Sequence, residues 1–477
     1  MTTKKAIFFF SLPVLVSLLL HLWVLKLDLI GYHVWRQTQT QTVIYNFTFS
    51  DHSIFHPQKF DLTNGTTSLL YEFPLYQWLI AQANNALGYS VLHTRLLSFL
   101  FFAALLLGFY RLLRCFVNRE VALISNTLLC FSPLLYYYCV NPLPDTLALC
   151  FAVWALFCFF QFITSKREAL FICFCLLILL ATLIKLPYLM FGIVLLPYLY
   201  RAFRGHRYTA LTKRILFFGA GMIPALAWYF KAIPTWDKNP VAMGMLANDK
   251  PVLQLLDYFW FHLISSTPEL LTNYAACIFL VSGIYWFFKQ HKYTEAVQLY
   301  FISLFAITVL YFLLEINMIE KVHDYYLMPF LPLLFLVSAY GVKMLYEKKK
   351  KVLVLFFTCL VPITAWLRIN TRWDLSSPGF TEDYLTQQAK LQSIIPQDQK
   401  CIINYDDSHF ICLYYLKRQG YSLFENELNE QALKDRYLKG AHYFVTEDLS
   451  LDLAQFPGFN FEELYSKNLK VYKLSLK

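Results

Sequence analysis

The chain of 477 residues carries 41 basic and 31 acidic residues, so only 15% of its residues are charged while 58% are hydrophobic. A typical soluble domain carries about 25% charged residues, and this composition excludes a disordered chain, a coiled coil and a nucleic-acid-binding domain. The charge is uneven, because residues 371–477 hold 12 basic and 15 acidic residues. This contrast predicts a membrane domain over residues 1–370 and a small soluble domain over residues 371–477.

Eleven apolar stretches of residues 1–370 are candidates for membrane-spanning helices. Such a helix needs about 20 apolar residues, because lipid offers no partners for free backbone N–H and C=O groups. We therefore expect a mainly α, polytopic membrane protein with about 11 spans. The stretches lie near 6–27, 93–114, 120–140, 145–163, 168–184, 187–203, 214–233, 271–288, 297–314, 325–344 and 352–369.

Basic residues indicate which loops face the cytoplasm. With the N-terminus inside, the inner segments hold 19 of the 41 basic residues, as the positive-inside rule requires. An odd number of spans then places residues 371–477 on the outer side. We expect a multi-pass membrane protein with a cytoplasmic N-terminus, a large first outer loop over residues 28–92 and a C-terminal domain on the outer (periplasmic or lumenal) face.

Strongly polar residues are concentrated at the outer ends of the spans. The first outer loop is expected to form two short amphipathic helices on the membrane face. In this loop, Glu72 precedes Pro74, so it would lie at the positive end of a helix dipole that keeps a carboxylate ionised. The other polar residues at outer ends are His33, Arg36, Gln37, Gln39, Asp61, Asp145, Lys185, His323, Tyr325 and Tyr326.

Each of these residues also has a simpler interpretation as an interfacial side chain in contact with water. Tyr325 and Tyr326 fit an aromatic belt, and Lys185 fits a side chain that reaches the interface as an anchor. The set as a whole nevertheless favours chemistry at the outer membrane surface. A transporter would instead place its binding site and its charged residues near the midplane of the membrane.

Four segments carry a family resemblance: HVWRQTQT (33–40), YEFPLYQWLI (71–80), NPLPDTLAL (141–149) and HDYYLMPFLP (323–332). Their layout resembles the integral-membrane glycosyltransferases of the C fold. These include protein O-mannosyltransferases, aminoarabinose transferases that act on lipid A, and bacterial relatives similar to dolichyl-phosphate-mannose-protein mannosyltransferases. The resemblance implies inverting transfer of a sugar from a polyprenyl-phosphate donor to a lipid, glycan or protein acceptor at the outer face.

The resemblance also implies roles for the polar residues. Arg36 and Lys185, with His323, would bind the donor phosphate. A carboxylate, Glu72 before Asp61 or Asp145, would act as base or bind a divalent cation. The remaining residues would bind substrate: His33, Gln37, Gln39, Tyr325 and Tyr326.

One position departs from the pattern of the family. Many relatives have an acidic residue where this chain has Gln39, and a neutral amide cannot act as a base. This departure keeps a non-catalytic membrane scaffold open as an alternative, and a transporter or flippase of a lipid-linked saccharide is the other alternative function class.

The C-terminal stretch alternates between strand and helix patterns. We expect helices over 381–395, 408–420 and 428–438, strands over 400–406 and 442–447, and a terminal hairpin over 461–476. This order predicts a small α/β domain with a partly parallel sheet. Cys401 and Cys412 fit either a disulfide or, more simply, two buried thiols.

Overall fold

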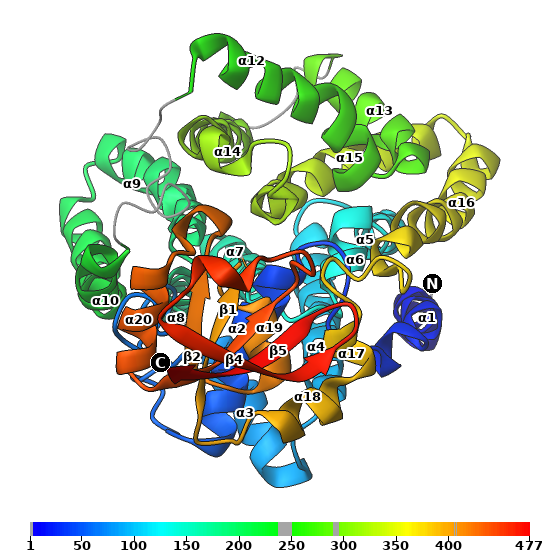
Figure 1. Ribbon diagram of the computed structural model, residues 1–477. Helices are drawn as coiled ribbons and strands as arrows, with labels where there is room; N and C mark the ends of the chain where they lie inside the picture. Colours follow the sequence, from blue (N-terminus) through cyan, green and yellow to red (C-terminus); the bar gives the residue numbers. More distant parts are fainter. Residues whose placement is uncertain (1–2, 237–249, 290–294, 405, 407) are drawn as a thin grey trace. The chain divides into compact units, whose positions relative to one another are not determined.

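The computed structural model describes residues 3–236, 250–289, 295–404, 406 and 408–477 (Figure 1). The chain divides into two compact units. Unit 1 consists of Met1–Leu25, Leu70–Phe73 and Arg95–Asn370, and unit 2 of Lys26–Leu69, Pro74–Thr94 and Thr371–Lys477. Unit 2 thus combines most of the first outer loop with the C-terminal stretch.

Unit 1 is helical throughout its described residues. Its α-helices are α1 (Thr3–His21), α4 (Val91–Leu113, whose first turn belongs to unit 2), α5 (Arg119–Cys130), α6 (Pro133–Tyr138), α7 (Asp145–Ser165), α8 (Glu168–Ile184), α9 (Leu195–Arg204), α10 (Tyr208–Ala232), α12 (Val252–Phe261), α13 (Cys277–Lys289), α14 (Glu295–Ile319), α15 (Leu331–Glu347) and α16 (Lys351–Ile369). Shorter 3-10 or π segments connect them, namely η2 (Leu186–Val194), η3 (Ile233–Thr235), η5 (His262–Leu271), η6 (Tyr274–Ala276), η7 (Asp324–Phe330) and η8 (Asn370–Trp373).

The helices of unit 1 are those of a multi-pass membrane protein. Over the described residues, 8 helices are long and apolar enough to cross a membrane, or 9 if the bent pair Val252–Leu271 and Tyr274–Lys289 forms one span. The expected number of about 11 is therefore approximate. The stretch 120–140 is not one helix, because α5 ends at Cys130 and Pro133 opens a second, short helix. Proline suits that first position, where its missing N–H is not needed.

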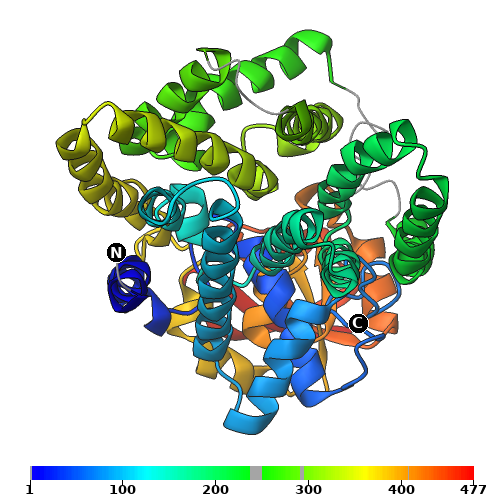
Figure 2. The same cartoon turned by 180° about the vertical axis from the view of Figure 1, so that it is seen from behind.

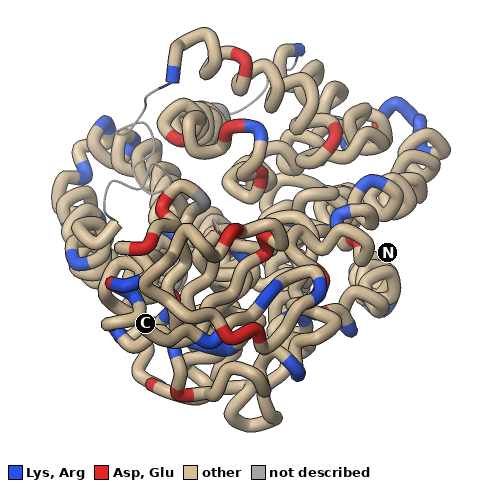
Figure 3. Tube along the Cα trace, in the orientation of Figure 1, with Lys and Arg blue, Asp and Glu red and all other residues tan. Residues whose placement is uncertain are grey.

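Packing and charge in unit 1 agree with a membrane setting. Phe230 is 87% exposed and Leu253 is 80% exposed, as expected for side chains that meet lipid. The helices α7 and α8 pack along each other, as do α13 and α15 (Figure 2). The latter pair approaches closely at Gly341, where a Cβ would lie 1.9 Å from the Phe279 oxygen. Most of the long helices carry few charges, whereas basic residues mark the turn between α15 and α16 (Figure 3).

Unit 2 contains a five-stranded mixed sheet in the order β2-β1-β3-β5-β4 (Figure 1). The first three strands are parallel, and β5 is antiparallel to both β3 and β4. This confirms the expected α/β fold of the C-terminal stretch. The strands are β1 (Lys400–Asn404), β2 (Gly420–Leu423), β3 (Ala441–Thr446), β4 (Phe459–Ser466) and β5 (Lys470–Leu476), and the helices are α2 (Val34–Phe49), α3 (Leu75–Leu87), α17 (Asp383–Thr386), α18 (Gln388–Ile394), α19 (Ile411–Leu416) and α20 (Glu430–Leu438).

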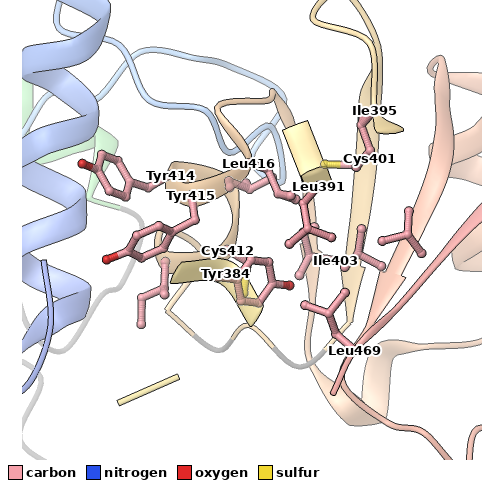
Figure 4. Packing of buried hydrophobic residues seen from close by; sticks show 14 of the residues in the cluster. Tyr384, Leu391, Ile395, Cys401, Ile403, Cys412, Tyr414, Tyr415, Leu416 and Leu469 are labelled. Carbon is pink, nitrogen blue, oxygen red and sulfur yellow. The ribbon is translucent and has the colours of Figure 1, made fainter. Parts of the chain in front are cut away.

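Alternate residues of each strand point to opposite faces of this sheet. On one face, Cys401 and Ile403 pack with Tyr384, Leu391 and the buried residues of α19 (Figure 4). On the other face, Ile402 packs in a second cluster with residues of β3 and α20. The sheet therefore has an apolar layer on each side, and each layer is covered by helices of unit 2.

The first outer loop is part of this C-terminal fold. Leu62 N donates to Gly420 O at 2.7 Å, and Gly420 N donates to Phe60 O at 3.1 Å, so the loop extends the β2 edge of the sheet. The expectation of a surface helix is wrong for α2, because 13 of its 16 residues are buried.

Candidate functional site

The candidate site in unit 1 is built around Lys185, at the break between α8 and η2. Pro187 lacks the N–H that would continue the helix by binding Leu183 O. That oxygen accepts instead from Phe73 N at 2.9 Å and from the Tyr229 hydroxyl at 3.1 Å. Lys185 then adopts an extended conformation, with φ −155° and ψ 115°. The proline thus ends the helix and sets the direction of the lysine side chain.

Asp145 is the ion-pair partner of Lys185. It occupies the first turn of α7, directly after Pro144, where the helix dipole favours a negative charge. Its Oδ1 lies 2.5 Å from Lys185 Nζ, and the side chains are 1% and 11% exposed, respectively. Tyr188 on η2 donates to the Asp145 main-chain oxygen at 3.3 Å. The two charges are therefore held together in a largely water-excluded place.

Two tyrosine rings complete the surroundings of the lysine. Lys185 Nζ lies 4.8 Å from the centre of the Tyr325 ring and 4.4 Å from that of Tyr326. Both rings come from η7, which Tyr311 of α14 fixes by donating to Tyr326 O at 2.8 Å. The ammonium group thus faces a carboxylate on one side and aromatic faces on another, a favourable setting for a cation.

Two residues near this cluster, Tyr138 and Glu315, were not identified from the sequence. Tyr138 donates to Asp324 Oδ1 at 2.6 Å. Glu315, on α14, lies one helical turn after Tyr311, whose hydroxyl donates to Tyr326 O at 2.8 Å. The sequence contained a signal for Glu315, since a carboxylate in a long apolar segment marks a functional position by default. The expected span 297–314 ended one residue before it, so this signal was missed.

Glu72 lies in the same unit, on the short segment Leu70–Phe73. Trp228 of α10 donates to Tyr71 O at 3.1 Å, and the Phe73 ring packs edge-on against Trp228 at 5.0 Å. Because Phe73 is hydrogen-bonded to the last turn of α8, Glu72 is held close to the helix end that presents Lys185. The structure therefore brings Glu72, Asp145 and Lys185 into one region of unit 1.

His323 directly precedes η7, and its side chain is hydrogen-bonded to the main chain. Its Nδ1 is paired with Met318 O at 2.8 Å. Burial lowers the pKa of His323, and the hydrogen bond to Met318 offsets part of this effect. A neutral imidazole with one nitrogen engaged can offer a hydrogen bond through the other, but adds no positive charge.

The other expected residues of the first outer loop, apart from Glu72, lie in unit 2. Arg36 is buried and its Nη1 donates to Gln39 Oε1. Gln37 donates to the main-chain oxygens of Ile30 at 3.2 Å and Tyr32 at 3.1 Å. His33 stands before α2 with φ 57° and accepts from Trp35 Nε1 at 3.3 Å. Gln39 thus orients the guanidinium group of Arg36.

Asp61, also in unit 2, is engaged in a structural ion pair. Its Oδ2 lies 2.6 Å from Lys59 Nζ, and both side chains are buried. Burial opposes ionisation, but the hydrogen bond from His409 and the charge of Lys59 hold the pKa of Asp61 well below its ordinary value. A carboxylate with so low a pKa is a poor proton acceptor.

No group of three or more His, Cys, Asp or Glu side chains among the described residues is arranged to hold a metal ion. The cluster around Lys185 instead provides an ammonium group that can bind an anion, carboxylates that can accept a proton, and aromatic faces that can stack on a sugar ring.

Comparison with known proteins identifies the fold. Residues 72–229, which include Glu72, Asp145 and Lys185, match the family described as dolichyl-phosphate-mannose-protein mannosyltransferase. No curated protein matches the chain significantly.

Solved structures match along the whole chain. ArnT from Cupriavidus metallidurans bound to undecaprenyl phosphate is 10% identical with a TM-score of 0.70, covering 99% of this chain and 98% of that chain. The oligosaccharyltransferase of Archaeoglobus fulgidus is 13% identical with a TM-score of 0.62, over 100% and 75% of the two chains. The mycobacterial arabinofuranosyltransferase AftD is 11% identical with a TM-score of 0.58, over 99% and 42%. The chain has the fold shared by these proteins, in agreement with the expected resemblance to the C-type integral-membrane glycosyltransferases.

Proposed function

We propose that this protein, with its C-type glycosyltransferase fold, transfers a sugar from a polyprenyl-phosphate donor to an acceptor at the outer face of the bacterial inner membrane, with inversion at the anomeric carbon. The observation that supports this most strongly is the buried pair of Lys185 and Asp145 beside two tyrosine rings. These residues lie at the ends of apolar helices, where a phosphate emerges from lipid while its prenyl chain stays in the membrane.

Lys185 binds the donor phosphate in this proposal. Its ammonium group is paired with the Asp145 carboxylate, and the carboxylate oxygens occupy the place that phosphate oxygens take in this proposal. A donor phosphate exchanges with Asp145 and forms a charge-assisted hydrogen bond to Nζ. Tyr325 and Tyr326 then flank the phosphate and the sugar. Arg36 stays a separate candidate for binding phosphate, because a guanidinium binds phosphate bidentately.

A carboxylate of unit 1 activates the acceptor. Glu72 removes the proton from the acceptor hydroxyl or amine, and Asp145 is the second candidate once the phosphate has displaced it from Lys185. The acceptor atom attacks the anomeric carbon on the face opposite the phosphate, and the carbon–oxygen bond to the phosphate breaks. The leaving polyprenyl phosphate keeps both electrons of that bond, and Lys185 stabilises the added charge. Asp61 has no role in this step, since it is committed to Lys59.

The proposal is tested with the purified protein in liposomes that contain polyprenyl-phosphate-linked sugars, by measuring the release of polyprenyl phosphate. Lys185→Ala is expected to reduce transfer at least about 100-fold, and Glu72→Gln by about 100-fold or more, the usual effect of losing a general base. Lys343→Met serves as the control and is expected to keep full activity. Lys343 lies near the C-terminal end of α15, away from the end that follows Tyr325 and Tyr326. Full transfer by both Lys185→Ala and Glu72→Gln would contradict the assignment.

A further inference from the structure

The surroundings of Lys185 contain more negative than positive charge. Asp145 lies 2.5 Å from the ammonium group, Glu315 lies on α14, which packs against the η2 segment that follows Lys185, and Asp324 precedes the two tyrosines whose rings contact Lys185. With these carboxylates ionised, the group has a formal charge of −2. Such a site favours a weakly charged anion over a strongly charged one.

Glu315 is the member of this group that the proposed mechanism does not use. It lies one helical turn after Tyr311, and residues four apart occupy the same face of a helix. The Tyr311 hydroxyl is bonded to Tyr326 O at 2.8 Å, and the Tyr326 ring lies under Lys185 Nζ at 4.4 Å. The helix α14 also packs against η2, which begins directly after Lys185. Glu315 therefore faces the phosphate-binding lysine from a membrane-spanning segment, where an ionisable side chain is costly.

The transfer reaction changes the charge of the phosphate. The donor is a phosphodiester with one negative charge, and breakage of the bond to the sugar leaves a phosphate monoester. A monoester carries close to two negative charges above pH 7, because its second pKa is about 6. The product therefore differs from the donor by about one additional negative charge, at a position next to Lys185.

We infer that Glu315 is a specificity-determining residue that makes the Lys185 site prefer the singly charged phosphodiester donor to the doubly charged monoester product, and so promotes product release. This inference rests on the proposed function, because it assumes that Lys185 binds the donor phosphate. Repulsion from one carboxylate at this range changes relative affinity by about three- to tenfold, since water near the membrane surface screens part of the interaction.

Two matched ligands test the inference without any knowledge of the sugar or acceptor. A short polyprenyl monophosphate and its methyl phosphodiester share the same prenyl chain and differ by one charge at pH 7.5. Their affinities are measured with the full-length protein in detergent. The wild type is expected to bind the diester more tightly, and Glu315→Gln is expected to tighten binding of the monoester so that the preference falls about threefold or more. Glu315→Asp keeps the charge and is expected to retain the preference.

Glu347→Gln serves as the control, because it removes a carboxylate at the far end of α15. The Glu347 side chain is 59% exposed and lies 4.0 Å from Lys343. This variant is expected to leave the preference for the diester unchanged. An unchanged preference in Glu315→Gln, or a wild type that binds the monoester more tightly, would overturn this inference but not the proposed function. A wild type that binds neither phosphate would overturn the proposed function together with the inference.

Discussion

Replacement of Lys417 by methionine is predicted to stabilise the protein in mild acid. Lys417 follows α19 with φ 54°, and its Nζ is buried with no hydrogen-bond partner. The ammonium group lies 3.2 Å from the centre of the Tyr414 ring, 5.0 Å from Tyr45 and 5.6 Å from Tyr89. Burial lowers the pKa of Lys417 to about 7, and the charge of Asp28 offsets only part of this effect.

The sign and size of the effect follow from this pKa. The folded protein releases the Lys417 proton near pH 7, whereas the unfolded chain holds it to about pH 10, so stability rises with pH between these values. One pKa unit corresponds to about 1.4 kcal/mol. Between pH 6 and pH 9 the free energy of unfolding of the wild type is therefore expected to rise by about 2–3 kcal/mol. Lys417→Met is not expected to show this rise, since methionine has no proton to release.

The assay is thermal unfolding of the detergent-solubilised protein at pH 6 and pH 9. Lys417→Met is expected to raise the melting temperature at pH 6 by several degrees more than at pH 9. Lys434→Met, which changes an exposed lysine on α20, serves as the control and is expected to shift both temperatures equally. A lower melting temperature for Lys417→Met at pH 6, or the same shift at both pH values, would refute the reasoning.

Three further predictions concern unit 2. Gly31→Ala is expected to lower stability by about 2 kcal/mol or more in thermal unfolding, because Gly31 has φ +81° and a Cβ would lie 1.9 Å from a main-chain oxygen. Gly65→Ala, with φ +74° but open space, should cost clearly less, and equal losses would contradict the steric argument. The low pKa of Asp61 predicts that wild type is more stable than Asp61→Asn at neutral pH, and that this difference shrinks as the pH falls below about 4; a difference independent of pH would be inconsistent with the buried ion pair. Cys401 and Cys412 are free and buried, so both should react with an alkylating reagent after denaturation without reductant, and protection of both would instead indicate a disulfide.

Long apolar stretches predicted most of the helices of unit 1 well. A single apolar segment in lipid can satisfy its own backbone N–H and C=O groups only as a helix. The expected stretch 93–114 corresponds to α4 (Val91–Leu113), and 168–184 to α8. The main error, the stretch 120–140, arose where hydropathy stayed high across Ser132 and Pro133. Composition averaged over such a stretch does not register a local break in the backbone.

Elements that depend on distant partners were harder to predict. The strand β2 (Gly420–Leu423) was missed, because four residues after a helix stop carry no clear alternation; the strand exists because β1 and the loop at Phe60 supply its hydrogen bonds. The polar sequence of α2 predicted a surface helix, although its side chains are buried. The pairing of Lys185 with Asp145 joins residues 40 positions apart, and no local pattern indicates it.

The central claim is that a polyprenyl phosphate binds at Lys185. An experimental structure of the protein with a polyprenyl monophosphate tests it most directly. We predict that a phosphate oxygen lies within hydrogen-bonding distance of Lys185 Nζ, beside Tyr325 and Tyr326, and that Asp145 no longer occupies that position. A phosphate bound elsewhere, with the pair of Lys185 and Asp145 intact, would contradict the account.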